Sequence, residues 1–368
     1  MELVALSSQY ANFYAPAFSI RVARDDIMRD RLIAVSQVEV DLQLGSPSRF
    51  AFTVTNCWSN KLHAFKTGRG DDILDFLKFG TEVEVFMGYG DAKSVPIAMA
   101  GMITEISTDF PESGSPELNI AGYDHGFPMT IGKNSRTWKD YRDSDAVREI
   151  ASFNNLQSKI ETTADVQKQI EQNQQGDWEF IKKLAEQNHF EVYIDERRVL
   201  HFARPNDDAT AAVKLPYGQG LLSFKPEANL AGQVSKVEVY GWDPKRKERI
   251  LGVARAGEES GRQGRSAGEL LKTFVRDPDK EPTLRFRLPV FTQAEAEKRA
   301  KAALNETAKK FLTGDAEAIG LPDLRPDRNV SLDGLGESFS KTYYIQQATH
   351  KIDGNGYRTR FKVKETAL

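Results

Sequence analysis

Histidine side chains are the first groups to test for catalysis or metal binding, because imidazole changes charge near neutral pH and is a common metal ligand. No two of them stand four residues apart, as they do in helical zinc motifs. The chain has five: His63, His125, His189, His201 and His350. The only cysteine, Cys57, excludes an internal disulfide and a zinc site of several cysteines. Because isolated residues of these types are usually packed or solvated, the sequence predicts no metal site and no cofactor.

Signatures of covalent catalysis and phosphate binding are not recognised either. We expect no G-x-S-x-G nucleophile elbow, no P-loop and no G-x-G-x-x-G turn after a strand. The 53 acidic residues make chance carboxylate pairs certain, so no glycosidase-like pair stands out. We therefore expect no enzymatic activity and no catalytic residues. A hydrolase with an unidentified carboxylate pair stays an alternative.

Basic side chains are the other candidates for function. The segment 243–249, DPKRKER, is interrupted by acids and has no interleaved aromatics, so we interpret it as a solvated hairpin tip. A second group alternates with apolar residues near the end of the chain: Arg358, Arg360, Lys362 and Lys364. Four like charges on one strand face repel unless water or an acidic partner compensates them. This row predicts either a solvated face or an assembly interface, and we expect a role in docking rather than in folding.

Composition narrows the class of protein. The 368 residues are 40% hydrophobic and 28% charged, which is typical of a soluble globular chain of two or three domains. A formal charge of −3 provides no chain-wide attraction to nucleic acid or to a membrane surface. The first residues lack a basic leader, and no apolar run reaches about 18 residues. We expect synthesis in the cytosol, no membrane anchor and no specific nucleic-acid partner.

Hydrophobic periodicity predicts a mainly β protein with an α+β insert. Alternating apolar residues over 15–130 predict about six antiparallel strands, which form a sandwich or a barrel in a first domain at 1–134. Helical spacing begins near Asp143 and Asp177, which we expect to cap two helices of a helix-hairpin module at 135–213. Strands then resume in a second strand-rich domain at 214–368. That domain is expected to contain a mobile excursion at about 254–270 and a helix at about 292–312.

Two ordered stretches resemble a known family. The segment 176–195, GDWEFIKKLAEQNHFEVYID, is similar to the helix-hairpin signature of phage late control gene D proteins, which form the baseplate hub of contractile tails. Trp138 stands ahead of it, as in the family's linker. The residues that match the signature are Asp177, Phe180, Ile181, Leu184, Ala185 and Glu186. The family's helix often ends in glycine, so Asn188 would have to adopt the left-handed conformation here.

The second stretch, at 314–363, resembles the end of the hub barrel that these proteins share with the valine-glycine-repeat spike proteins of type VI secretion. The matching residues are Gly314, Pro322, Leu335, Gly336, Tyr344, His350, Gly356, Tyr357 and Thr359. No valine-glycine-rich spike and no lysozyme-like insert follows. We therefore expect the spike to be a separate chain.

The resemblance implies a homotrimer in which two tail-tube-like barrels per chain form a ring of six. Such a ring would join a sixfold tail tube to a threefold central spike. The implied partners are two further copies of the chain, the spike, the tail tube or its initiator, and other baseplate components. The chain would be made in the bacterial cytoplasm and assembled into the baseplate of a phage virion or an extracellular injection particle. A tail-associated peptidoglycan hydrolase is the second reading. A nucleic-acid-binding late regulator, suggested by the family's name, is a third reading that the net charge disfavours.

Overall fold

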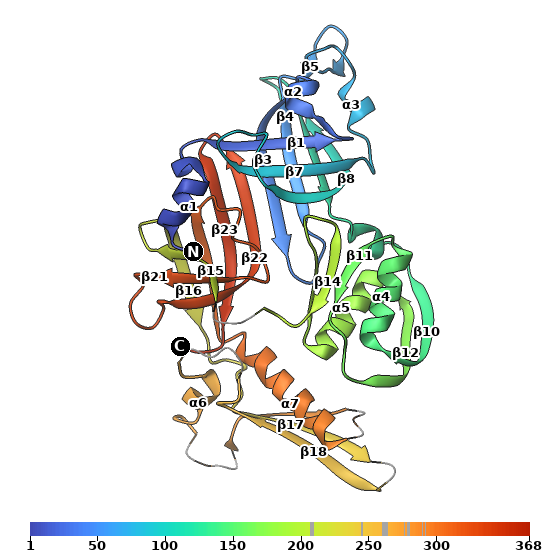
Figure 1. Cartoon of the computed structure of the whole chain (residues 1–368), viewed down its shortest axis with the longest axis vertical. Helices are drawn as coiled ribbons and strands as arrows, with labels where there is room; N and C mark the ends of the chain where they lie inside the picture. The colour runs from blue at the N-terminus through green and yellow to red at the C-terminus, as the bar shows by residue number, and fades with distance from the viewer. Residues whose placement is uncertain are drawn as a thin grey trace.

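One large, almost entirely antiparallel sheet dominates the structure, a computed structural model that describes residues 1–206, 210–243, 246–259, 264–275, 277, 280–288, 290 and 292–368. The sheet has 13 strands and occupies the upper and middle parts of the molecule in Figure 1. They are β1 (Pro16–Val22), β2 (Asp25–Asp26), β3 (Ala34–Gln43), β4 (Arg49–Thr55), β7 (Glu82–Tyr89), β8 (Ile97–Asp109), β9 (Glu117–Tyr123), β15 (Ala211–Pro216), β16 (Leu221–Ala228), β20 (Leu312–Ile319), β21 (Asn329–Asp333), β22 (Lys341–Asp353) and β23 (Gly356–Glu365). The expected mainly β class with an α+β insert is confirmed.

The two predicted strand blocks are halves of this one sheet. The strand order runs β16-β20-β23-β22-β3-β4-β9-β8-β7-β1-β2, so β22 of the second block pairs directly with β3 of the first. In that antiparallel pair Val40 lies opposite His350, and Val38 lies opposite Ile352. Main-chain hydrogen bonds therefore run without a break from one block to the other.

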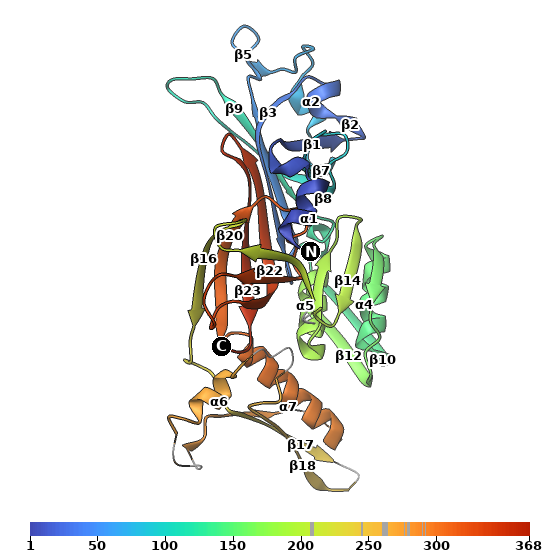
Figure 2. The same ribbon diagram turned by 60° about the vertical axis from the view of Figure 1, so that its left-hand side comes forward.

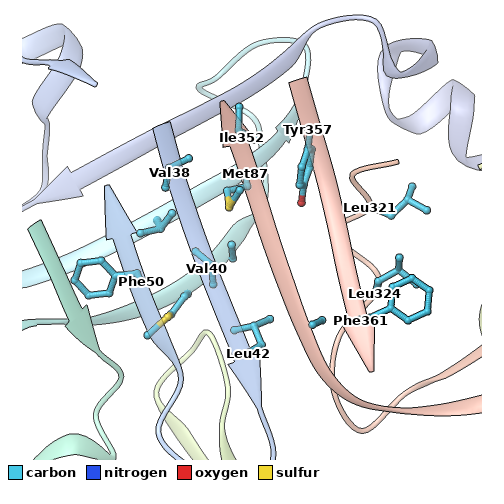
Figure 3. Close-up of a cluster of buried hydrophobic side chains, with 14 of the residues drawn as sticks. Val38, Val40, Leu42, Phe50, Met87, Leu321, Leu324, Ile352, Tyr357 and Phe361 are labelled. Atoms are coloured by element: carbon cyan, nitrogen blue, oxygen red, sulfur yellow. The ribbon is translucent and has the colours of Figure 1, made fainter. Parts of the chain in front are cut away.

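The main core lies on one face of this junction. Side chains at alternate positions of β3, β4 and β23 point into it, because successive residues of a strand face opposite sides. Figure 3 shows these side chains converging from both halves of the sheet. They include Val38, Val40, Phe50, Met87, Ile352, Tyr357 and Phe361, each at most 5% exposed. The halves therefore share one hydrophobic core.

Short elements complete the first half: α1 (Leu3–Gln9), η1 (Ala11–Phe13), α2 (Ile27–Asp30), β5 (Trp58–Ser59), β6 (Ala64–Phe65), α3 (Ile73–Phe76) and η2 (Phe127–Thr130). The start of the chain contacts the second half, although the sequence places it in a domain at 1–134. The Met1 amino group donates to Ala212 O at 2.7 Å, and Lys214 N donates to Met1 O at 3.0 Å. No described helix has the length and apolar composition needed to span a bilayer.

The α+β insert predicted at 135–213 corresponds to seven elements beside the large sheet (Figures 1 and 2). They are β10 (Asn134–Arg142), α4 (Asp143–Phe153), β11 (Gln157–Ile160), β12 (Val166–Gln175), α5 (Asp177–Asn188), β13 (Glu191–Ile194) and β14 (Val199–Ala203). We call this segment the helix-hairpin module. β15 begins within the predicted range but pairs with β21 of the large sheet.

The expected helix caps of the module need correction. Arg142 and Gly176 occupy the N-cap positions, and Asp143 and Asp177 are the first helical residues. The left-handed residue after α5 is His189, with φ of 56°, rather than Asn188. Asn188 ends the helix and donates its side-chain amide to Asp143 Oδ2 at 2.7 Å, which ties α5 to α4.

Residues 236–308 form a separate unit, which corrects the single barrel domain predicted for 214–368. Its elements are β17 (Lys236–Asp243), β18 (Glu248–Arg255), β19 (Thr283–Arg287) and α7 (Gln293–Ala308); α6 (Ala267–Leu271) lies between them in sequence, but its Ala267 packs in the main core. The sheet order is β18-β17-β19, and α7 covers one face with a core of its own. We call it the α7 unit. Its helix agrees with the one expected at 292–312, and Thr292 Oγ1 accepts from Glu295 N as an N-cap.

The predicted excursion at 254–270 lies partly outside the described residues, since 260–263 are not among them. Its described part includes the end of β18 and α6, so it is not wholly irregular. The segment 243–249 joins β17 to β18, as a hairpin tip should, with Asp243 opposite Glu248 and residues 244–245 outside the described ones.

We expect Gly252→Ala to destabilise the α7 unit by about 1–3 kcal/mol, because overpacking forces the backbone apart. A Cβ added at Gly252 would stand 2.1 Å from the carbonyl carbon of Ala296 in α7. Hydrogen exchange should show faster exchange across β17, β18 and α7. Gly354→Ala is the control, since its Cβ would have no neighbour within 4 Å. Equal exchange in both variants would contradict the close contact between β18 and α7.

Candidate functional site

The basic row predicted on the last strand divides into an exposed part and a buried end. On β23 the side chains of Tyr357, Phe361 and Val363 point into the core. Arg358, Arg360 and Lys362 are exposed on the opposite face, as the alternation predicts. Lys364 is only 8% exposed, so it is not part of an accessible row.

Lys364 lies between the large sheet and the helix-hairpin module. Its Nζ is 3.5 Å from Glu191 Oε1 on β13 and 5.0 Å from the centroid of the Tyr344 ring. Burial lowers the pKa of Lys364 and raises the pKa of Glu191, while each charge favours the ionised form of the other. The assignment of Lys364 to an assembly interface is therefore corrected, since it serves as an internal contact.

The acidic groups that compensate the exposed row belong to the same chain. Across β20, Asp315 lies opposite Lys362, and Glu317 lies opposite Arg360 with Oε2 3.5 Å from Arg360 Nε. Arg358 differs, because Ile319 stands opposite it on β20. We call the exposed side of β16, β20, β23 and β22 the polar face.

The neighbouring strands extend this polar face. On β22, Gln347 and Thr349 each donate to Asp41 Oδ1 of β3 at 2.8 Å, which carries the hydrogen-bonded pattern across the junction of the halves. A groove of about 350 Å³ follows the face, and carboxylate, ammonium, guanidinium, hydroxyl and amide groups line it. This lining of opposite charges and hydrogen-bonding groups suits electrostatic docking.

Sequence reasoning missed the two acids of β20. A signal was present, since Asp315 and Glu317 alternate with alanines in GDAEAI just as the basic residues alternate on β23. The pattern shows that both rows lie on a strand face, but only the register of the two strands shows that they face each other.

His350 is a buried structural residue. Its Nε2 donates to Leu324 O at 3.0 Å, and its Nδ1 accepts from the Thr359 hydroxyl at 3.1 Å and the Tyr357 hydroxyl at 3.0 Å. Thr359 Oγ1 in turn accepts from Leu321 N. Burial, aided by the positive charge of Arg325, lowers the pKa of His350 to about 3. The neutral ring therefore connects β22 and β23 to the segment 321–324.

The remaining histidines and Cys57 do not form a reactive group. His125 contacts Glu82 at 3.1 Å, and His201 contacts Asp195 at 2.8 Å. The described residues contain no cluster of three His, Cys, Asp or Glu side chains that could hold a metal ion. Cys57 is 4% exposed, and burial raises its pKa, so the unreactive thiol predominates.

One motif match corrects the sequence analysis. Residues 264–268 read GRSAG and thus do fit G-x-S-x-G, contrary to the expectation above. Ser266 is 0% exposed and is the N-cap of α6, where it forms a capping box with Glu269. Its hydroxyl is therefore used for helix capping, not presented as a nucleophile.

Asp177 is the polar centre of the helix-hairpin module. Its carboxylate accepts hydrogen bonds from four side chains: Asn134, Arg136, Asn154 and Gln172. Burial alone would raise the pKa of Asp177, but these donors together lower it below its usual value. Of the other residues that match the family signature, Phe180, Ile181, Leu184 and Ala185 are buried in the core of the module, whereas Glu186 is exposed. The ring of Trp138 stacks on Phe180 at 5.7 Å.

The segment 324–328 holds the module against both halves of the sheet. Arg325 Nη2 donates to Ala98 O of β8 at 3.1 Å and to Glu196 Oε2 of the β13–β14 turn at 2.9 Å. Asp327 accepts from the Tyr193 hydroxyl of β13 at 3.3 Å and from the Tyr344 hydroxyl of β22 at 2.9 Å. These contacts hold the helix-hairpin module beside the large sheet.

Comparison with known proteins identifies the architecture. The family model described as the Alg8 N-terminal domain matches residues 70–354, more than half of the chain. No curated protein sequence matches. The 43 kDa tail protein of prophage MuSo2 from Shewanella oneidensis is similar in structure, with a TM-score of 0.70 and 13% identity over 96% of this chain and 99% of that one.

Two further solved structures share the fold. A tail protein from Neisseria meningitidis has a TM-score of 0.67 and 16% identity, with 96% of this chain and 97% of that one covered. A component of the E. coli type VI secretion system has a TM-score of 0.54 and 11% identity, with 94% and 76% covered. The chain thus has the fold of phage tail proteins over nearly its whole length. Membership in the late control gene D family itself stays a prediction.

Proposed function

The chain belongs to the Alg8 N-terminal domain family, and from its tail-protein fold we propose that it is the structural baseplate hub of a contractile tail or phage-like injection system. The observation that carries this proposal is the likeness to the MuSo2 tail protein, which covers both chains almost completely. In this role the chain joins a sixfold tail tube to a threefold spike carried on a separate chain.

The proposed assembly is a homotrimer. Each chain contributes the two strand blocks of its 13-stranded sheet, so three copies supply six blocks in a ring. Cyclic closure of three copies leaves no unpaired interface. We expect three copies per particle when assembled particles are imaged, or when the chain co-purifies with its spike and is weighed by light scattering. A monodisperse dimer or hexamer would count against this proposal.

The proposed role is structural and not enzymatic. It is supported by the capping role of Ser266 and by the core position of His350. A peptidoglycan zymogram of the purified chain is expected to show no cleared band, with hen lysozyme as the positive control. The carboxylates to test first for hydrolase activity are Asp143, Glu171 and Glu295, because they line a cleft of about 760 Å³ between α5, β12 and α7. A band that disappears in Glu171→Gln would establish the hydrolase alternative.

We expect Arg358→Glu to leave the melting temperature nearly unchanged and to reduce particle assembly. Arg358 is exposed and stands opposite Ile319 and Lys351, so the reversal introduces no repulsion within the sheet. Exposed charges contribute about 0–1 kcal/mol to stability, whereas like charges across an interface oppose docking. Melting and particle yield are measured together, with Lys159→Glu on β11 as a matched exposed control. Normal particles with Arg358→Glu would show that the row is only a solvated face.

A further inference from the structure

Among the described residues, the sheet of the α7 unit is covered on one side only, by α7. Val237 and Val239 of β17 are fully buried against α7, while Tyr240 and Trp242 on the opposite side are 37% and 50% exposed. This unit lies at one end of the molecule, away from the first half of the sheet (Figures 1 and 2). An uncovered sheet face with two exposed aromatic side chains requires an explanation.

Strand register identifies the side chains that share this face. Tyr240 lies opposite Leu251, and Trp242 opposite Arg249, on the antiparallel β18. On the parallel β19, Arg287 lies beside Tyr240, and Arg285 beside Glu238. We call this side of the sheet the outer face: Lys236, Glu238, Tyr240, Trp242, Arg249, Leu251, Val253, Arg255, Arg285 and Arg287.

The outer face is strongly positive although the chain as a whole carries a charge of −3. Its five basic residues oppose a single carboxylate, which leaves four net positive charges. That carboxylate, Glu238, is already held by Lys236 Nζ at 2.5 Å, Arg285 Nε at 3.0 Å and the Tyr240 hydroxyl at 2.8 Å. Among the described residues no carboxylate lies within ion-pair distance of Arg249, Arg255 or Arg287.

The arrangement of side chains on the outer face is typical of a protein-binding surface. Tyr240, Leu251 and Trp242 form an apolar centre, and arginines surround it. Interfaces are enriched in Trp, Tyr and Arg, with binding energy concentrated at an apolar centre inside a polar rim. Two copies of this face would repel each other, which excludes its pairing with itself. Single-stranded nucleic acid is less well suited, because Leu251 and Val253, the β18 residues opposite Tyr240 and Glu238, offer no further stacking surface.

We propose that the outer face binds an acidic protein surface that belongs to another polypeptide. Carboxylates of that partner meet Arg249, Arg255 and Arg287, and an apolar or aromatic side chain of the partner packs against Trp242 and Leu251. The inference does not depend on the proposed hub role, since it rests on the α7 unit alone.

The test uses the full chain and poly(Glu,Tyr), a random acidic copolymer with aromatic side chains, as the probe. We expect saturable binding that weakens when salt is raised from about 50 to 200 mM, because the contacts are charged. Trp242→Ala should weaken binding about thirtyfold, as the loss of an interface centre does. Arg249→Glu with Arg287→Glu should weaken it at least a hundredfold. Leu251→Asn provides a second change at the centre, and thermal melts verify that each variant is folded.

The matched control is Lys159→Glu with Lys168→Glu, which makes the same charge change at exposed positions of β11 and β12. It should keep binding within about threefold of the unmodified chain. Failure of the unmodified chain to bind poly(Glu,Tyr), or an equal loss in the control, would overturn the proposal. Tighter binding to a 20-residue oligothymidylate that is lost in Trp242→Ala would assign the face to nucleic acid instead.

Discussion

Replacing Arg325 by methionine is expected to lower the free energy of unfolding by about 3 kcal/mol, because removal of one member of a buried ion pair leaves its partners unsatisfied. The guanidinium is 15% exposed and bonds both Glu196 of the helix-hairpin module and the carbonyl of Ala98 in β8. Burial lowers the pKa of Arg325, and the charge of Glu196 partly offsets that effect. The variant should therefore loosen the module from the large sheet.

Denaturant unfolding monitored by hydrogen exchange is the appropriate measurement, since it separates the module from the sheet. Arg328→Met is the matched control, because Arg328 lies in the same segment and is exposed. In a double-mutant cycle, Arg325→Met with Glu196→Met should be less destabilised than the sum of the single variants. Additive effects would mean that the two side chains do not interact in solution.

A second large effect is expected on acidification, and it depends on His350. Its folded pKa is about 3, whereas the ordinary value is 6.5. Below pH 6.5 His350 binds a proton in the unfolded chain, whereas in the folded chain it stays neutral until about pH 3. The stability contributed by neutral His350 is therefore lost as pH falls through this window, at about 1.4 kcal/mol per pH unit. At pH 4.5 the loss is about 2.7 kcal/mol.

His350→Gln should be less stable than the unmodified chain at pH 7.5, because Thr359 and Tyr357 lose the acceptor at Nδ1. Its stability should then fall less steeply between pH 6.5 and 4. Asp124 acts in the opposite sense, since burial raises its folded pKa to about 6 and its contribution is lost as pH rises through that value. Subtracting the stability profile of His350→Gln from that of the unmodified chain removes the contribution of Asp124, which both chains share. Parallel profiles would show that His350 is not shielded from protonation.

Several features could be predicted from local pattern alone. The alternation of Tyr357, Phe361 and Val363 with basic residues correctly separates the two faces of β23. The helical spacing after Asp143 and Asp177 correctly places α4 and α5. Both succeed because a repeat of two or 3.6 residues is a local property, set by which side chains must leave water.

The prediction that Asp143 and Asp177 are N-caps was wrong because the local pattern allows two positions for each aspartate. An aspartate before an amphipathic run suits the N-cap, but it also suits the first turn of a helix. Tertiary hydrogen bonds decided between the two positions: Asp177 is held by side chains of β10, of β12 and of the C-cap residue of α4, and Asp143 by Asn188. These donors come from residues up to 45 positions away, which no local pattern contains.

The sequence by itself determined the mainly β class, the position of the helices and the presence of a basic strand face. Only the tertiary structure decided that the two blocks share one sheet through β3 and β22, that Asp315 and Glu317 face the row, and that Lys364 is buried against Glu191. It also separated the α7 unit, whose strands have the same period as those of the large sheet. The physical reason is that periodicity fixes which face of a strand is apolar, whereas the choice of neighbouring strand depends on contacts between residues distant in sequence.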